Sequence, residues 1–236
     1  KYTYQGEKLV GSISSVSAIA NGDNFSIAST WASRVVSQEM SLLVLDGMAS
    51  SQEEVALLAE QARNKPNEIR DFGTKLHKYI EEVCNGNDPT LPEGDEKLRN
   101  ACIELKLFAQ EYLEPKATEL RLVLQTNPPI AGTADLICSL KGNPSEYFVL
   151  DWKGVTKGSL KYPLKKSFFC QLEAYRHAVI QNYNINCVGF IVVRIDRDTA
   201  EIKAEIHRPK DSSLIDIFMA CREIFLMPKK FETELL

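Results

Sequence analysis

The chain has 236 residues, of which 44% are hydrophobic, and its formal net charge is −4 at neutral pH. It is long enough to bury a full core, and its charge argues against a wholly basic nucleic-acid binder. No apolar run approaches the roughly 20 residues that cross a bilayer, and no leader pattern follows Lys1, so we expect a soluble, cytoplasmic protein.

The first half of the sequence predicts mainly helix. Residues 1–22 indicate a short strand and a turn, and apolar residues at helical spacing predict a helix over Ser26–Leu45. A second helix is expected over Ser51–Asn64, because Ser51 can cap it and Glu54 stands at capping-box distance. Pro66 is then expected to interrupt the helix and restart the chain.

Two more helices are expected in this half. The first carries a buried stripe and stops at an Asn-Gly-Asn turn, residues 85–87. Its stripe consists of Phe72, Leu76, Ile80 and Val83. The second is expected over Asp95–Tyr112.

The second half changes to the alternation that is typical of strands. Strands are expected near residues 118, 132, 148, 190 and 203, with helices over about 167–183 and 213–226. The strand over residues 188–195 is nearly all apolar, as in a central strand, whereas that over 200–207 alternates like an edge strand. We therefore predict an α/β fold in which helices flank a central mixed sheet. Residues 1–115 form a mainly helical part and residues 116–236 the sheet, within one domain.

Charged residues gather at the ends of two predicted strands. Asp151 and Lys153 point to one face of their strand while Trp152 points to the other. Asp135 ends the polar face of the preceding apolar run, Ile130–Ile137, and the short linker Lys141–Ser145 lets the two strands pair as a hairpin. Two acids and a lysine at one sheet edge are what a magnesium-assisted phosphodiester hydrolase needs. An ordinary cross-strand salt bridge is the alternative interpretation.

A lysine-rich segment follows directly. Between Trp152 and Leu172 the sequence contains no acidic residue and five lysines: Lys153, Lys157, Lys161, Lys165 and Lys166. Residues 154–166 are called the lysine loop below. Its place after Asp151 favours contact with phosphate, although such runs are more often simply solvated. By contrast, the six cysteines show no CxxC spacing, so neither a zinc ribbon nor an iron–sulfur cluster is expected.

Four short sequence segments, taken in chain order, form a recognisable set of motifs. They are GTKLHKYIE (73–81), GTADLI (132–137), LDWKG (150–154) and QLEAY (171–175). Together they closely resemble the four signatures of PD-(D/E)XK nucleases of the RecB-like type, which include many phage exonucleases. The resemblance covers about Phe72 to Arg194. It implies a restriction-endonuclease-like core with the N-terminal helical part beside it.

The resemblance also implies roles for individual residues. One or two Mg²⁺ or Mn²⁺ ions would be held by His77, Asp135, Asp151 and the Trp152 backbone carbonyl. Glu119 matches a position where some members carry another acid. Asp135, Asp151 and Lys153 would form the catalytic centre, where Lys153 orients the attacking water. Gln171 and Tyr175 would lie near the scissile phosphate, and Lys157, Lys161, Lys165 and Lys166 would bind the DNA backbone.

Each role has a structural alternative. His77 could be a structural histidine, Glu119 a solvated strand residue, Gln171 a helix cap and Tyr175 a core residue. The sequence also departs from the family in two ways. Asp151 stands where many members have glutamate, and the clustered C-terminal cysteines of the iron–sulfur branch are missing.

The expected function is a Mg²⁺- or Mn²⁺-dependent DNA exonuclease that acts in phage or bacterial recombination, repair or DNA processing. Its setting would be the cytoplasm of a bacterium or of a phage-infected host cell. A structure- or sequence-selective endonuclease is one alternative, and a non-catalytic DNA-binding subunit is another. A homo-oligomer or a recombination partner protein is compatible with the sequence, and no membrane partner is expected.

Overall fold

A computed structural model describes residues 3–4, 7–9, 12–21 and 52–230. Contacts divide the chain into two compact units, one of Lys1–Gly22 and Leu76–Leu236, the other of Asp23–Lys75. In the second unit, the described residues belong to helix α3 (Gln52–Cys84). The helix predicted over Ser26–Leu45 and the Ser51 cap lie outside the described residues.

Helix α3 is continuous through Pro66, so the predicted interruption at this proline is wrong. A proline removes one backbone hydrogen bond from a helix, but its fixed φ angle is itself helical. The residues before Pro66 include many strong helix formers, among them Ala56, Leu57 and Glu60. The summed preference of a long segment therefore outweighs one unfavourable position.

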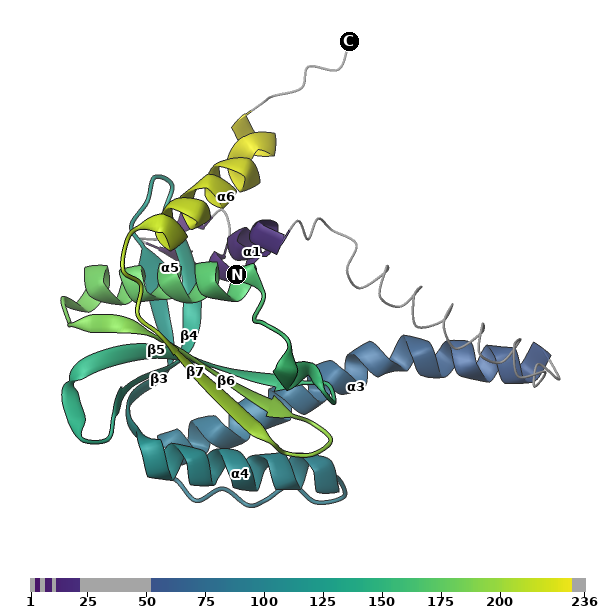
Figure 1. Ribbon diagram of the computed structural model, residues 1–236. Coiled ribbons are helices and arrows are strands. Elements are labelled where there is room, and N and C mark those ends of the chain that lie inside the picture. The colour runs from purple at the N-terminus through teal and green to yellow at the C-terminus, as the bar shows by residue number, and fades with distance from the viewer. Residues whose placement is uncertain (1–2, 5–6, 10–11, 22–51, 231–236) are drawn as a thin grey trace, which may run out of the picture. The chain divides into compact units, whose positions relative to one another are not determined.

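Five strands form the central sheet, in the order β3-β4-β5-β6-β7 (Figure 1). Their bounds are Leu113–Leu124, Ile130–Leu140, Asn143–Val155, Cys187–Asp196 and Ile202–His207. β5 and β6 are parallel, and every other neighbouring pair is antiparallel. The sheet is therefore mixed, which confirms the predicted α/β class. The expected hairpin is β4–β5, whose turn contains Gly142 at φ +82°.

One face of the sheet is covered by helix α5 (Lys166–Tyr183), which connects the two parallel strands. Phe190 and Val192 of β6 belong there to the same buried hydrophobic cluster as Cys170 and Val179 of α5. Helices α1 (Ile13–Ser17) and α6 (Ser213–Lys230) add buried residues to the same core, including Ile13, Val16 and Phe218. Figure 1 shows α5 between the sheet and α6.

Helix α4 (Glu96–Tyr112) covers the other face, where Phe108 packs edge-on against Trp152. It begins where predicted, because Asp95 accepts a hydrogen bond from the backbone N–H of Leu98 at 3.0 Å. Among the short elements of the main unit are the strands β1 (Thr3–Tyr4) and β2 (Glu7–Lys8) and the 3₁₀ turn η1 (Ala18–Asn21). Over the described residues, no helix has both the length and the apolar character that a membrane span requires.

Candidate metal and catalytic site

The candidate site lies where β4 and β5 separate. The last paired residues of the hairpin are Leu136 and Leu150, and the next residues along the two strands are Asp135 and Asp151. Beyond this point β4 still pairs with β3, while β5 pairs with β6 as far as Val155. The two strands thus form a fork, and the two acids stand at its opening.

Two side chains bind the backbone of Trp152 at this fork. The Trp152 N–H donates to Asp135 Oδ2 at 3.1 Å, and His77 Nε2 lies 2.9 Å from the Trp152 carbonyl oxygen. Because a carbonyl only accepts, Nε2 must carry the hydrogen. The other ring nitrogen, Nδ1, faces Asp135 Oδ2 at 3.4 Å. In a neutral histidine with its hydrogen on Nε2, this nitrogen has a lone pair that faces a carboxylate oxygen, an arrangement that suits a cation between the two atoms.

Glu119 joins this pair from the neighbouring strand. β3 and β4 pair at Thr118–Leu136 and at Leu120–Ala134, which places Glu119 opposite Asp135. Its φ is +45°, an unfavourable angle for a residue with a side chain. One ligand atom each of His77, Glu119 and Asp135 lies within 4.8 Å of the other two. These three residues are called the acidic group below.

Asp151 and Lys153 form an ion pair beside the acidic group. The ammonium lies 2.8 Å from Asp151 Oδ1 and 2.7 Å from Oδ2, and the aspartate side chain is only 6% exposed. Burial alone would lower the pKa of Lys153, but the carboxylates of Asp151 and Asp135 raise it above its usual value. Lys153 is therefore charged at neutral pH. Asp151 Oδ2 is buried, and its neighbour is the Lys153 ammonium at 2.7 Å.

Negative charge is concentrated at the fork. Burial and the nearby Asp151 raise the pKa of Asp135 to about 6, against the lowering effect of His77 and Lys153. Burial also raises the pKa of Glu119, as does the charge of Glu81. Carboxylates held together in this way are stabilised by a cation.

The residues present fit a divalent metal ion. The acidic group offers an imidazole nitrogen facing a carboxylate, and the carboxylate of Asp151, which pairs with Lys153, stands next to Asp135 at the fork. Mg²⁺ and Mn²⁺ prefer such oxygen-rich sites. The Trp152 carbonyl, a predicted ligand, accepts the hydrogen bond from His77 and so lies at the same place.

Glu119 provides a direct test of this fit. Glu119→Gln should weaken Mn²⁺ binding by at least about tenfold, a loss typical even of side chains that only support a metal ligand. Glu114→Gln is the matched control, since Glu114 stands on the same strand and its contacts are with Lys116 and Ser139, not with the acidic group. Isothermal titration calorimetry with Mn²⁺ measures both. Equal affinities for Glu119→Gln and the parent protein would remove Glu119 from the site.

Sequence reasoning did not assign a role to Glu81, which stands one helical turn after His77. Its charge is among the causes that raise the pKa of Glu119, so the two carboxylates lie near each other. The spacing of four residues from His77 was the available signal. This spacing shows that the two residues share a helix face, but it does not show which residues pack against that face.

Gln171 and Tyr175 are both on α5, and neither is in the acidic group. Tyr175 is 4% exposed and belongs to the hydrophobic core, as the structural alternative for this residue predicts. Its ring lies so close to Gly132 that a Cβ there would be 2.5 Å from Tyr175 Cε1. Gln171 is half-buried. A role for either at the scissile phosphate stays a prediction.

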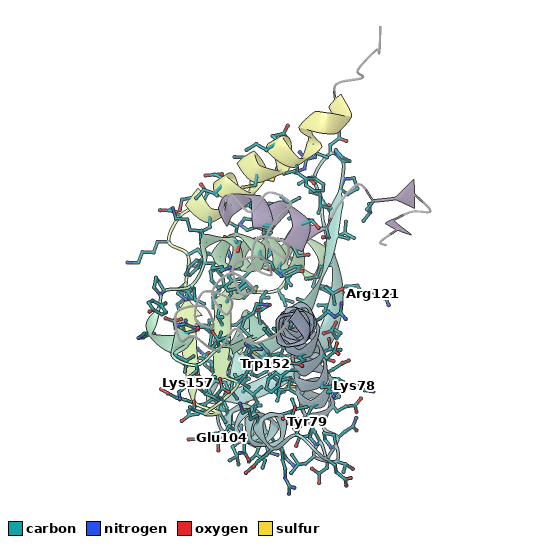
Figure 2. The ribbon with its side chains drawn as sticks, turned by 90° about the vertical axis from the view of Figure 1, so that its right-hand side faces the viewer. Lys78, Tyr79, Glu104, Arg121, Trp152 and Lys157 are labelled. Atoms are coloured by element: carbon teal, nitrogen blue, oxygen red, sulfur yellow. The ribbon has the colours of Figure 1, made fainter. Side chains whose placement is uncertain are left out.

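The four lysines assigned to DNA binding, Lys157, Lys161, Lys165 and Lys166, are all exposed. In the view of Figure 2, Lys157 lies to one side of Trp152, and Lys78 and Arg121 lie to the other. Cationic side chains thus appear on both sides of the fork in this view.

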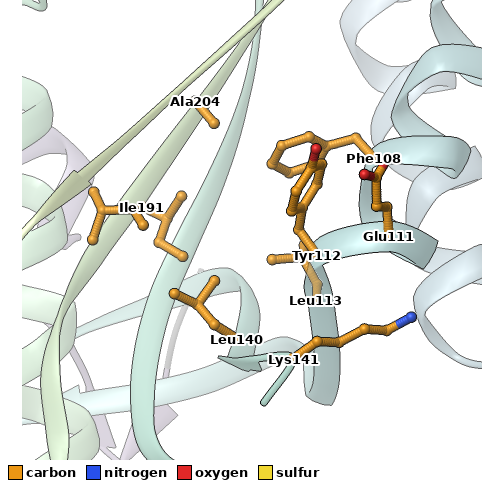
Figure 3. A pocket seen from close by; sticks show the side chains of 9 residues that line it. Phe108, Glu111, Tyr112, Leu113, Leu140, Lys141, Ile191 and Ala204 are labelled. Atoms are coloured by element: carbon orange, nitrogen blue, oxygen red, sulfur yellow. The ribbon is translucent and has the colours of Figure 1, made fainter. Parts of the chain in front are cut away.

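A pocket of about 410 Å³ lies elsewhere, between the end of α4 and the sheet (Figure 3). Its lining is mostly apolar and includes Phe108, Tyr112, Leu140 and Ile191. Glu111 and Lys141 are the only charged residues that line it. The pocket shares no residue with the acidic group and is not part of the candidate site.

No known family model matches the chain, and no curated protein matches its sequence. The functional proposal therefore depends on the geometry at the fork and on the residues of the four motifs.

Proposed function

We propose that the protein is a divalent-metal-dependent DNA nuclease with a restriction-endonuclease-like, PD-(D/E)XK-type core, and that it acts as an exonuclease. The observation that carries this proposal is the fork between β4 and β5. There a buried aspartate pairs with a charged lysine directly beside His77, Glu119 and Asp135. The order and spacing of the four motifs support the same assignment.

The residues at the fork have distinct tasks in this proposal. His77, Glu119 and Asp135 would hold the ion, together with the carboxylate of Asp151, which also pairs with Lys153. When bound, a divalent cation supplies a more acidic water and offsets negative charge on the phosphate. The hydrogen bonds from Trp152 N–H and to its carbonyl fix the position of the ligands before substrate arrives.

Lys153 would act on the reacting phosphate. Its charge is maintained by two carboxylates, and its ammonium stands at the mouth of the fork. A fixed positive charge there stabilises the negative charge that develops as water attacks phosphorus, and it can orient that water. Asp151 has two tasks, since it holds both Lys153 and the ion.

A non-catalytic DNA-binding subunit is less well supported. Carboxylates at the fork would repel DNA phosphates, and their burial is unfavourable to the fold, as the raised pKa of Asp135 shows. A module that only binds DNA gains nothing from this arrangement. In a nuclease the same carboxylates have a use, because they bind the metal ion.

The exonuclease assignment is tested by comparing DNA forms. With Mg²⁺ or Mn²⁺, end-labelled linear duplex should be degraded while covalently closed circles persist. Reading a base sequence requires contacts to base edges, and no part of the sequence resembles a separate recognition domain. Prompt nicking of closed plasmid at defined sites, with linear DNA no better a substrate, would instead establish the endonuclease alternative.

The lysine loop should contribute the salt-sensitive part of DNA binding. Replacing Lys157, Lys161, Lys165 and Lys166 by alanine should weaken duplex binding and flatten its salt dependence. Each lost phosphate contact changes the log–log slope by about 0.9. Fluorescence anisotropy between 50 and 200 mM salt, roughly the range over which such contacts are lost, measures the slope. The exposed pair Lys116 and Lys210 is the control, and a slope shared by both variants would mean that the loop is merely solvated.

A further inference from the structure

Tyr162, in the lysine loop, is the most exposed large hydrophobic side chain in the described part of the chain, at 60%. It stands between Lys161 and Lys165, and the Lys161 ammonium lies 5.3 Å from the centre of its ring. Aromatic rings are normally buried because of their large apolar area. A ring displayed in this way among cations needs an explanation.

The backbone beneath Tyr162 is held from inside the protein. Arg194 on β6 has a side chain that is only 4% exposed, and its Nη1 donates to the carbonyl oxygen of Tyr162 at 2.8 Å. Its Nη2 pairs with Glu205 on β7 at 2.8 Å. Lys203 Nζ donates to the carbonyl oxygen of Leu160 at 3.3 Å. Two strands of the sheet thus fix the loop at the point where the tyrosine is displayed.

The N-terminal half of the loop is fixed as well. Its 3₁₀ turn η2 (Ser159–Lys161) follows Gly158, which has φ +75° and whose N–H donates to the buried Asp196 at 3.0 Å. Leu160 of this turn is buried. The loop is therefore a formed structure, and a ligand would bind it with little loss of backbone entropy.

Both ends of the loop lie beside the proposed catalytic lysine. The loop begins directly after Lys153, with the last two residues of β5, and it enters α5, whose Phe168 ring centre lies 5.3 Å from Lys153 Nζ. A strand of nucleic acid on the loop would thus lie next to the fork.

We propose that Tyr162 stacks on an unpaired base, so that the lysine loop binds single-stranded DNA. Lys161 and Lys165 would contact the phosphates on either side of that base. Aromatic rings combined with cations are the usual means of binding single strands without sequence preference. Bases inside a duplex already stack on each other and offer no free face. The inference deepens the proposed function, on which it rests, by naming the substrate at the fork as an already unpaired strand or a frayed end.

The test is a comparison of variants in DNA binding, measured in EDTA so that no cleavage occurs. The probes are a fluorescein-labelled oligo-dT and a blunt hairpin duplex, followed by anisotropy. Tyr162→Ala should weaken oligo-dT binding by about 5- to 150-fold, the range that base–aromatic stacking gives. Tyr162→Phe, which keeps the ring, should bind like the parent. Tyr183→Ala removes another exposed tyrosine, at the end of α5, and is the matched control.

Two further measurements distinguish a loss of base stacking from a general loss of DNA binding: the salt dependence of binding and the affinity for the duplex probe. Tyr162→Ala should leave the salt slope and the duplex affinity unchanged, because the ring carries no charge. Equal oligo-dT affinity in Tyr162→Ala and the parent would overturn the inference, as would an equal loss on both probes or no oligo-dT binding by the parent. Nuclease activity is assayed separately. If the protein cleaves DNA but Tyr162→Ala does not selectively weaken oligo-dT binding, only this inference is refuted. If Tyr162→Ala selectively weakens oligo-dT binding but the protein does not cleave DNA, only the nuclease proposal is refuted.

Discussion

Replacing Lys153 by alanine should lower DNA cleavage by about 10²–10³-fold, the loss typical when one preorganised stabilising group is removed from a transition state. The ammonium is held by Asp151 and is not itself a metal ligand. Mn²⁺ binding should therefore persist, because the change leaves the acidic group intact. The loss should appear in kcat more than in KM, since the charge acts mainly on the transition state.

The measurement is single-turnover digestion of labelled DNA, together with calorimetric titration of Mn²⁺. Because Lys153→Ala leaves a buried carboxylate without its partner, both assays are run well below the melting temperature of the variant. Lys97→Ala is the matched control, since it also removes a lysine from a lysine–aspartate ion pair, with Asp198. Unchanged cleavage by Lys153→Ala would show that the ion pair is structural, as in the alternative interpretation of these residues.

Replacing Asp135 by asparagine should stabilise the metal-free protein at pH 7. In the folded protein the pKa of Asp135 is raised to about 6, above the usual value of 3.8. Ionisation is thus unfavourable to the folded state, and stability falls as the pH rises from about 4 through about 6. Asparagine removes this cost and can still accept the hydrogen bond from Trp152. We expect a gain of about 1–3 kcal/mol in the free energy of unfolding.

Asp151→Asn should instead lower the free energy of unfolding of the metal-free protein, although it also removes one carboxylate from the fork. It takes the nearest counter-charge from the half-buried ammonium of Lys153. The expected loss of stability is less than the roughly 3–5 kcal/mol of a broken buried pair, because Asp135 remains nearby.

Urea unfolding in EDTA at pH 7 and pH 4 measures both variants. The gain of Asp135→Asn should nearly vanish at pH 4, where the parent carboxyl is mostly protonated. Lower stability of Asp135→Asn than of the parent at pH 7 would contradict the assigned electrostatics.

Much of the sheet could be predicted from the sequence because alternating burial leaves a period of two. The apolar run over residues 188–195 predicts a central strand, and β6 is buried almost throughout. The alternation over 200–207 predicts an edge strand, and β7 is the last strand of the sheet. The hairpin that brings Asp135 next to Asp151 follows from the short linker between their strands. These features depend on local patterns.

Other features of the site depend on contacts that the sequence pattern does not encode. The separation of β4 and β5 beyond Leu136 and Leu150 frees the Trp152 backbone, but nothing in either strand indicates where pairing stops. The positive φ of Glu119 is unfavourable locally, so local preference argues against it. The contact between Arg194 and the lysine loop joins residues 32 positions apart. Each depends on tertiary packing.

The most direct test of the proposed function is digestion of end-labelled linear DNA by the purified protein with Mn²⁺, with Mn²⁺ plus excess EDTA, and by Asp151→Asn with Mn²⁺. The proposal predicts rapid release of nucleotides in the first reaction only. Equal release in the presence of EDTA, or by Asp151→Asn, would contradict a metal-dependent nuclease centred on the fork.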